Sequence, residues 1–210
     1  MGFLAEQFYG KTQKRCFANI THISNMPSIV KYGLLSYDRS RNINHVSVAL
    51  EGVQKRREQK SVPNGLPLHN YASLYFDPRN PMMYRLRCHM DPEQFRQLVV
   101  LAISIEVLDI DGVVVTDGNA ASSVTRFYSP EEGIASLNYQ LIYAKWWNDP
   151  DNPYAEEEKK RVKCAEVLVP HCIQQSKIDS AVVSSEEIKE ILITQGFLNK
   201  IHVEPDVFFL

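Results

Sequence analysis

The segment from Gln97 to Ile110, QLVVLAISIEVLDI, constrains the fold of this chain more than any other stretch. Its odd-numbered positions from 99 to 107 are all apolar, the pattern of a β-strand with one face on a hydrophobic core. Further strands are expected at residues 14–24, 71–76, 111–118, 161–170 and 177–185. Helices are expected at residues 25–33, around 46–59, at 129–147 and at 186–196, the last with a Ser184–Glu187 capping box. Because strands and helices do not alternate regularly, the sequence predicts an α+β fold.

Size and composition indicate a single domain spanning residues 1–210. The chain has 210 residues, of which 44% are hydrophobic, and its net charge is −2, so any nucleic-acid partner must meet a local basic patch. No stretch approaches the roughly 18 apolar residues of a membrane span, and the N-terminus lacks the apolar core of a signal peptide. The four cysteines have no zinc-like spacing. These features predict a cytoplasmic protein without a metal site.

Glu166 lies in the predicted strand RVKCAEVLVP among neighbours that are otherwise mostly apolar. Removing a carboxylate from water is unfavourable unless it is ion-paired or used. Strand alternation places Glu166 on the same face as Cys164 and Leu168. If that face lines a cleft, the carboxylate could stabilise the cationic sugar that forms during glycosidic cleavage. A structural ion pair with one of the arginines explains the same carboxylate, and the residues alone leave both roles open.

Two polar pairs are candidates for phosphate binding. His22 and Asn25 lie three residues apart in ITHISNM, at the junction of a strand and a helix N-terminus, where phosphate is favoured. A capping residue beside a buried core histidine is the simpler interpretation of that pair. Arg56 and Arg57, in VQKRREQK, have guanidinium groups suited to a pyrophosphate, although a solvated helical face is the commoner meaning of such a run.

Aromatic side chains in YASLYFDPRNPMMY offer flat surfaces for a nicotinamide ring or a nucleobase. Tyr75, Phe76 and Tyr84 are the main candidates. Because neighbours on a strand face opposite ways, either Tyr75 or Phe76 must belong to the core.

The segment TDGNAASSVTRFYS is rich in small polar residues that leave backbone N–H groups open. Asn119 and Ser122, with Arg126 close behind, could contact a base edge or a phosphate. A turn that caps a helix beginning near Ala120 is the alternative.

Together and in this order, these segments resemble one family. ITHISNMPSIVKYGLLS, the Lys-Arg-Arg segment, LPLHNYASLYFDPRNPMMY, VVTDGNAASSVTRFY and CAEVLVP are similar to the DarT family, over roughly residues 18 to 185. DarT proteins are NAD+-dependent DNA ADP-ribosyltransferase toxins of bacterial toxin–antitoxin pairs. The resemblance implies an ADP-ribosyltransferase-like fold, with two packed, mostly antiparallel sheets around an NAD+ cleft and flanking helices. It also implies single-stranded DNA and a DarG-like macrodomain antitoxin as partners of a monomeric enzyme.

The resemblance assigns roles around the cleft. Glu166 corresponds to the catalytic glutamate, which would stabilise positive charge at C1 of the ribose as nicotinamide leaves and accept the proton of the attacking base. Arg57, preferred to Arg56, corresponds to the NAD+-contacting arginine. His22 and Asn25 map to the NAD+-binding start of the domain, and an aromatic residue, Tyr75 or Tyr84, is expected to stack on nicotinamide.

The resemblance also places the DNA. The segment from Asn148 to Lys163 is expected to be a polar substrate-recognition loop next to the catalytic glutamate. The predicted DNA contacts are Asn119, Ser122, Arg126, Trp147, Lys160 and Arg161.

Two segments depart from the family pattern. Many members have TDGHA where this chain has TDGNA, with Asn119, and YVPFYF where it has YASLYF. Both guanine and thymine are modified in the family, and we favour guanine. Transfer to RNA or protein, or a non-catalytic single-strand-binding module, are the alternatives, although phosphate binding gives no reason for a buried acid at Glu166.

Overall fold

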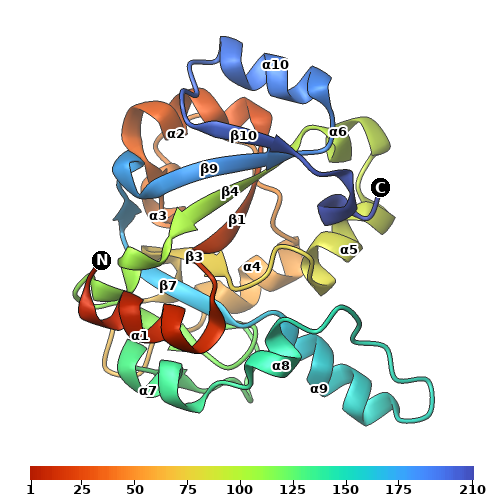
Figure 1. Cartoon of the computed structure of the whole chain (residues 1–210). Helices are drawn as coiled ribbons and strands as arrows, with labels where there is room; N and C mark the ends of the chain where they lie inside the picture. Colours follow the sequence, from red (N-terminus) through yellow and green to blue (C-terminus); the bar gives the residue numbers. More distant parts are fainter.

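A large, mostly antiparallel sheet organises the computed structural model, which describes all 210 residues (Figure 1). Its strand order is β10-β9-β4-β1-β3-β7-β5-β6, and only the β10–β9 pair is parallel. The strands are β1 (Cys16–His22), β3 (Tyr71–Tyr75), β4 (Leu98–Ser104), β5 (Val114–Thr116), β6 (Phe127–Tyr128), β7 (Glu166–Pro170), β9 (Ile178–Val183) and β10 (Lys200–Val203). A second, two-stranded sheet pairs β2 (Leu34–Leu35) with β8 (Cys172–Ile173). The α+β fold with two mostly antiparallel sheets is confirmed, although the two sheets are very unequal.

Short helices surround the sheet. They are α1 (Phe3–Thr12), α2 (Met26–Tyr32), α3 (Tyr37–Ser40), α4 (Glu51–Glu58), α5 (Pro81–His89), α6 (Pro92–Arg96), α7 (Pro130–Ser136), α8 (Tyr139–Ile142), α9 (Pro153–Lys163) and α10 (Glu186–Thr194). Single 3-10 turns occupy Ile23–Asn25, Leu68–Asn70, Ile105–Asp109, Gln175–Lys177 and Pro205–Phe208. None of the helices has the length and apolar character that crossing a bilayer requires.

The two faces of the sheet differ. One face carries the main hydrophobic core, to which α1, α2, α7, α8 and α10 contribute buried side chains. Helices α1 and α7, far apart in sequence, lie side by side over this face (Figure 1). The opposite face is covered in part by α5, α6 and the C-terminal 3-10 turn, which form a smaller core. The remainder of that face is open to the cavities described below.

The strand predicted at residues 97–110 differs from the pattern in two ways. It ends at Ser104 and is followed by a 3-10 turn, Ile105–Asp109. The side chain of Ser104 caps this turn by accepting a hydrogen bond from the N–H of Glu106. All residues of β4 except Ser104 are buried, on both faces. The reason is position. Strand β4 lies in the sheet between β1 and β9, and a hydrophobic core covers each of its two faces. Alternation with polar residues is therefore not required.

The segment Asn148–Lys163, predicted to be a loop that recognises the substrate, is mostly the helix α9, so the prediction of a loop was wrong. Asn152 caps its N-terminus by accepting from the N–H of Ala155, and Pro153 occupies the first turn. Ion pairs of i,i+3 and i,i+4 spacing link the glutamates to Lys160 and Arg161 along the helix. These local pairs make a polar segment helical without a broad apolar face.

Two helix boundaries also shift. Residues 129–147 form two short helices, because Asn138 caps α8 and interrupts the predicted single helix. The cap of α10 is Ser185, which accepts from the N–H of Ile188, whereas Ser184 donates to the carbonyl of Arg96. The short helix after Asn25, the helix within residues 46–59 and the strands predicted at residues 14–24, 71–76, 111–118 and 177–185 form within the predicted ranges. The strand predicted at residues 161–170 begins only at Glu166, because the helix α9 continues to Lys163 and Cys164 caps it.

Candidate active site

A buried ion pair lies at the start of β7. Glu166 is 1% exposed and Arg57, from α4, is 8% exposed. Nη1 of Arg57 lies 2.9 Å from Oε2 and 3.2 Å from Oε1 of Glu166, and the backbone N–H of Ala120 donates to Oε1 over 2.7 Å. Both oxygens of the carboxylate are therefore held by hydrogen-bond donors.

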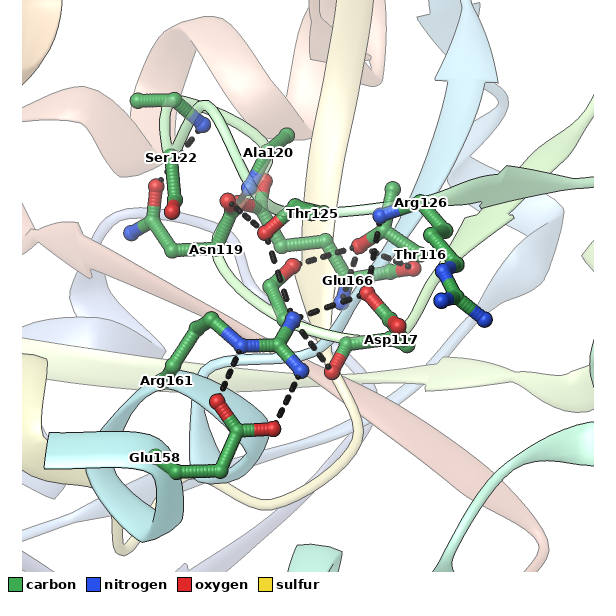
Figure 2. A network of polar contacts seen from close by, with 12 residues as sticks. Thr116, Asp117, Asn119, Ala120, Ser122, Thr125, Arg126, Glu158, Arg161 and Glu166 are labelled. Carbon is green, nitrogen blue, oxygen red and sulfur yellow. Dashed lines mark hydrogen bonds and ion pairs between the residues drawn. The ribbon is translucent and has the colours of Figure 1, made fainter. Parts of the chain in front are cut away.

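Neighbouring strands fix both members of this pair. Nη2 of Arg57 donates to Oγ of Ser73 in β3 over 2.6 Å. The N–H of Glu166 donates to Oγ1 of Thr116 over 3.0 Å, and that hydroxyl donates to the carbonyl of Gly118 over 2.7 Å (Figure 2). Ser73 and Thr116 were not among the residues predicted from the sequence. Ser73 could have been found from the sequence, because it is two residues before Tyr75 in the same strand and therefore faces the same side of the sheet. Tyr75 lies directly opposite Glu166 in the sheet.

The ion pair forms part of the wall of a cleft. A cavity of about 180 Å³ borders Arg57, Ser73, Tyr75 and Glu166, and it shares eight lining residues with a second cavity of about 190 Å³. The shared residues are Asn19, Ile20, Leu34, Leu35, Tyr37, Val48, Ala49 and Gln54. The two cavities thus form one elongated, mainly apolar cleft with a charged end at Glu166, a shape and chemistry suited to an extended ligand that carries aromatic rings.

Three polar side chains organise the middle of this cleft. Tyr37 packs its ring against that of His69 with 4.2 Å between centroids, and Nε2 of His69 lies 2.9 Å from Oε1 of Gln54. Burial, opposed by Asp38 and assisted by the nearby Arg57, lowers the pKa of His69. The ring is therefore neutral at neutral pH and donates from Nε2 to Gln54. No periodic pattern in the sequence marked these residues, which come from three separate segments.

The cleft opens into a wider groove of about 730 Å³, and Leu50, Val53, Met82 and Asn119 line both. The turn from Asp117 to Arg126 and the helices α4, α5 and α9 form its walls. Nζ of Lys60 holds the turn by donating to the carbonyls of Ala120 and Ser122. Since the N–H of Ala120 contacts Glu166, the turn connects the groove directly to the buried carboxylate.

The profile of a protein family described as "ssDNA thymidine ADP-ribosyltransferase, DarT" matches residues 18–209. The chain belongs to the DarT family. The family resemblance and its NAD+-dependent ADP-ribosyltransferase class, predicted from the motifs, are confirmed.

Curated and solved DarT proteins support this assignment. A DNA ADP-ribosyl transferase–DNA ADP-ribosyl glycohydrolase fusion protein of Thermosipho africanus is 34% identical over 196 residues, covering 90% of this chain and 48% of the fusion. This chain therefore spans about half the length of that relative. Thermus sp. 2.9 DarT in complex with ADP-ribosylated ssDNA superposes with a TM-score of 0.78 and 28% identity, covering 93% of this chain and 96% of that one. The same Thermus protein in complex with NAD+ gives a TM-score of 0.73 and 26% identity over 91% of this chain and 96% of that one.

The residues predicted to contact NAD+ in this DarT chain fall in different places. Tyr75 lines the cleft, whereas Phe76 packs in the core against Phe8 and Phe17. Asn25 lines the second cavity, where its side chain bonds both the N–H and the carbonyl of Val46 over 2.8 Å.

His22 and Tyr84 lie apart from the cleft. His22 lines neither cavity; its Nδ1 accepts from the N–H of Ser24, its Nε2 has no partner, and burial lowers its pKa. Tyr84, on α5, packs its edge against Trp147 and Phe209. Tyr84 lines neither cavity of the cleft, so of the two tyrosines only Tyr75 lies beside Glu166.

Of the residues predicted to contact DNA, Asn119, Ser122, Lys160 and Arg161 line the groove. Arg161 is already engaged: Nε and Nη2 donate to Glu158 and Nη1 donates to Asp117 over 2.8 Å (Figure 2). Lys160 pairs with Glu156 and Glu157. These pairs explain why two basic residues next to the groove contribute little free positive charge.

Trp147 and Arg126 lie outside that groove. Trp147 is largely buried and borders a neighbouring groove between α5 and α9. Arg126 is exposed, and in Figure 2 its guanidinium points away from Asn119 and Ser122. Its backbone N–H instead bonds Asp117 and closes the turn.

Proposed function

We propose that this chain transfers ADP-ribose from NAD+ to thymine in single-stranded DNA. The observation that carries the proposal is the buried Arg57–Glu166 pair, which lines an apolar cleft and is hydrogen-bonded to the turn that borders an open groove. The Thermus relative that shares this fold is known in complex with NAD+ and with ADP-ribosylated ssDNA. In our proposal the cleft accommodates NAD+ and the groove accommodates the strand.

The chemistry follows from the charge of Glu166. Positive charge develops on the ribose as its bond to nicotinamide breaks, and a carboxylate held by Arg57 and the Ala120 N–H is fixed in place before that charge appears. Such a fixed charge stabilises the transition state more than the ground state. In this proposal Glu166 also accepts the proton that the attacking base nitrogen must lose. That edge of the base is hydrogen-bonded in a duplex, which explains the requirement for a single strand.

We assign two cofactor-binding roles within the cleft. Tyr75 lies beside Glu166 and offers its ring to nicotinamide, and Asn25 lies at the far end of the cleft, where the adenosine half would extend. Arg57 faces Glu166 and Ser73, so we propose that it holds the catalytic carboxylate in addition to any contact with NAD+. The side chains of the cleft form no group of three metal-ligating residues, and none of these roles requires one.

Thymine replaces guanine as the favoured base. The family that matches residues 18–209 is described by thymidine modification, and that description outweighs the preference for guanine, which the two sequence departures had left open. One of those departures, Asn119, lines both the cleft and the groove, so it lies where the reacting base would enter.

We also propose the biological setting. One DarT relative is fused to a DNA ADP-ribosyl glycohydrolase, an enzyme that removes the modification. We therefore propose that this chain, as a single monomeric ADP-ribosyltransferase domain, is a toxin that a DarG-like macrodomain antitoxin counteracts. We propose that it acts on DNA in the bacterial cytoplasm.

Mass spectrometry of defined oligonucleotides tests the proposal. The protein is incubated with NAD+ and single strands that differ only in one base, and Glu166→Gln serves as the inactive control. We expect one added ADP-ribose on strands that contain thymine, and none on the same strands in duplex form. Modification of guanine alone would refute the base assignment. Modification of RNA or protein alone would refute the proposed acceptor, and binding without any transfer would indicate a non-catalytic module.

A further inference from the structure

The groove next to the cleft contains four cationic side chains, which differ in whether they are already paired. Lys160 and Arg161 form ion pairs with carboxylates of α9 and with Asp117. Arg56 and Arg85 are exposed, and their side chains make no ion pair or hydrogen bond with the rest of the chain. The free positive charge of the groove therefore comes from Arg56 on α4 and Arg85 on α5.

Helix geometry directs both free arginines to the groove. Leu50, Val53 and Arg56 are spaced by three residues and all line it, while Arg57, the next residue of α4, points inward to Glu166. On α5, Met82 and Arg85 are likewise three apart and line the same groove. Two adjacent arginines of the Lys-Arg-Arg segment thus serve two different compartments.

We propose that Arg56 and Arg85 form a clamp for the phosphates that flank the reacting nucleotide, and that the strand then continues across the ring of Tyr84. This inference rests on the proposed function for the identity of the ligand. Both arginines border the groove and neither borders the NAD+ cleft, so a pyrophosphate in the cleft does not account for them. A guanidinium with all its donors free is suited to a phosphate oxygen pair.

A second groove indicates where the bound DNA strand continues beyond the first groove. It holds about 590 Å³ between α5 and the segment before α9, and it shares Pro81, Arg85, Glu157 and Lys160 with the first groove. Tyr84 borders it and is 49% exposed, with its ring supported edge-on by Trp147 at 6.0 Å and by Phe209 at 5.3 Å between centroids. A half-exposed ring fixed from behind is a suitable platform for an unpaired base.

Binding of a fluorescent thymine-containing oligonucleotide, without NAD+ and over a range of KCl concentrations, tests the clamp. Removing one cation that binds a phosphate of a single strand lowers the slope of log affinity against log salt by about 0.7. We expect this decrease for Arg56→Gln and for Arg85→Gln, with roughly three- to tenfold weaker binding at low salt, and twice the slope change in the double variant. Lys55→Gln is the matched control, since Lys55 is an exposed cation of α4 that does not line the groove.

Strand length tests the continuation across Tyr84. Tyr84→Ala is expected to weaken binding of a long oligonucleotide by about tenfold, and to have no effect on one trimmed until it no longer reaches the second groove. Equal losses for both lengths would show that Tyr84 acts only on folding and would overturn this part of the inference.

Two outcomes would overturn the clamp. One is a salt slope for Arg56→Gln and Arg85→Gln that equals that of Lys55→Gln. The other is a raised KM for NAD+ with unchanged DNA binding in Arg56→Gln, which would return Arg56 to the NAD+ site. Failure of the proposed function gives a different result. If DNA binds through both arginines but is never ADP-ribosylated, the clamp is supported and the proposed transfer is refuted.

Discussion

The cleft and the groove share four lining residues, yet they hold charge in opposite ways. In the cleft, one carboxylate and one guanidinium are withdrawn from water and held by each other and by β3 and the Asp117–Arg126 turn. In the groove, Lys160 and Arg161 are partly exposed and paired with carboxylates, whereas Arg56 and Arg85 are exposed and free. A buried charge without its partner is costly, whereas an exposed charge is screened. Substitutions in the cleft should therefore have large effects that salt barely changes, and substitutions in the groove small, salt-dependent ones.

The largest effect is expected for Glu166→Gln. The amide keeps an acceptor for the N–H of Ala120 but removes the negative charge that opposes the ribose cation, so transfer should fall about 100- to 1000-fold. The measurement is the rate of ADP-ribose addition to an oligonucleotide at saturating NAD+. The NAD+ affinity of this variant, measured in parallel, is expected to stay near that of the wild-type protein. A folded Glu166→Gln protein with nearly normal transfer would contradict the catalytic assignment.

Arg57→Ala is expected to come next, because it affects both stability and transfer. It leaves Glu166 buried without its ionic partner, at a cost of about 3–5 kcal/mol in the free energy of unfolding. Arg56→Ala, one residue earlier and exposed, should stay within about 0.5 kcal/mol. Urea unfolding of the two variants measures the difference. If both variants lost the same free energy of unfolding, the buried Arg57–Glu166 pair would contribute no more to stability than an exposed arginine of the groove.

Lys60→Met tests the connection between the two regions. Nζ of Lys60 holds the carbonyls of Ala120 and Ser122, so its removal should release the turn that lies between Glu166 and the groove. A charge-assisted hydrogen bond contributes about 1.5–3 kcal/mol, which predicts roughly a tenfold or greater loss of transfer to DNA. Lys60→Met should lower the rate of transfer to DNA more than it lowers NAD+ affinity, and Lys60→Arg should retain part of the wild-type transfer rate. An equal loss of NAD+ affinity would indicate a general defect of the cleft.

The smallest effect is a pH dependence that arises at His69. Burial lowers its pKa below the ordinary 6.5, so the folded state favours the neutral ring. The corresponding stabilisation is present above pH 6.5 and is lost as the pH falls through the folded-state pKa. Thermal unfolding between pH 8 and pH 5 should therefore show a steeper acidic decline for the unmodified protein than for His69→Gln. Identical pH profiles would show that His69 does not titrate differently in the folded cleft.

Local pattern was sufficient for most of the fold. Period-two and helical spacing located β1, β3, β4, β5, β7 and β9 and the helices α2, α4, α7 and α10, because those signals report one buried face and need no knowledge of the partner. They failed at β4, where a hydrophobic core on each side of the sheet buries both faces, and at α9, where side-chain pairs stabilise a helix that lacks a broad apolar face. Helix α1 and the strands β2, β6, β8 and β10 were not predicted. Helix α5 was not predicted at all, since PMMYRLRCH follows a strong turn signal and its buried residues are only Met83 and Leu86.

For the site, the sequence by itself determined that a carboxylate would be buried at position 166, because no other residue of that strand is polar between Ala165 and Val169. The tertiary structure decided what that carboxylate meets. Arg57 and Ser73 come from segments 109 and 93 residues away, and only the pairing of β3 with β7 and the docking of α4 bring them to Glu166. The sequence also supplied two adjacent arginines, but helix rotation alone sends Arg57 into the cleft and Arg56 to the groove. Burial follows from local pattern, whereas the partner of a buried charge depends on contacts between residues distant in the chain.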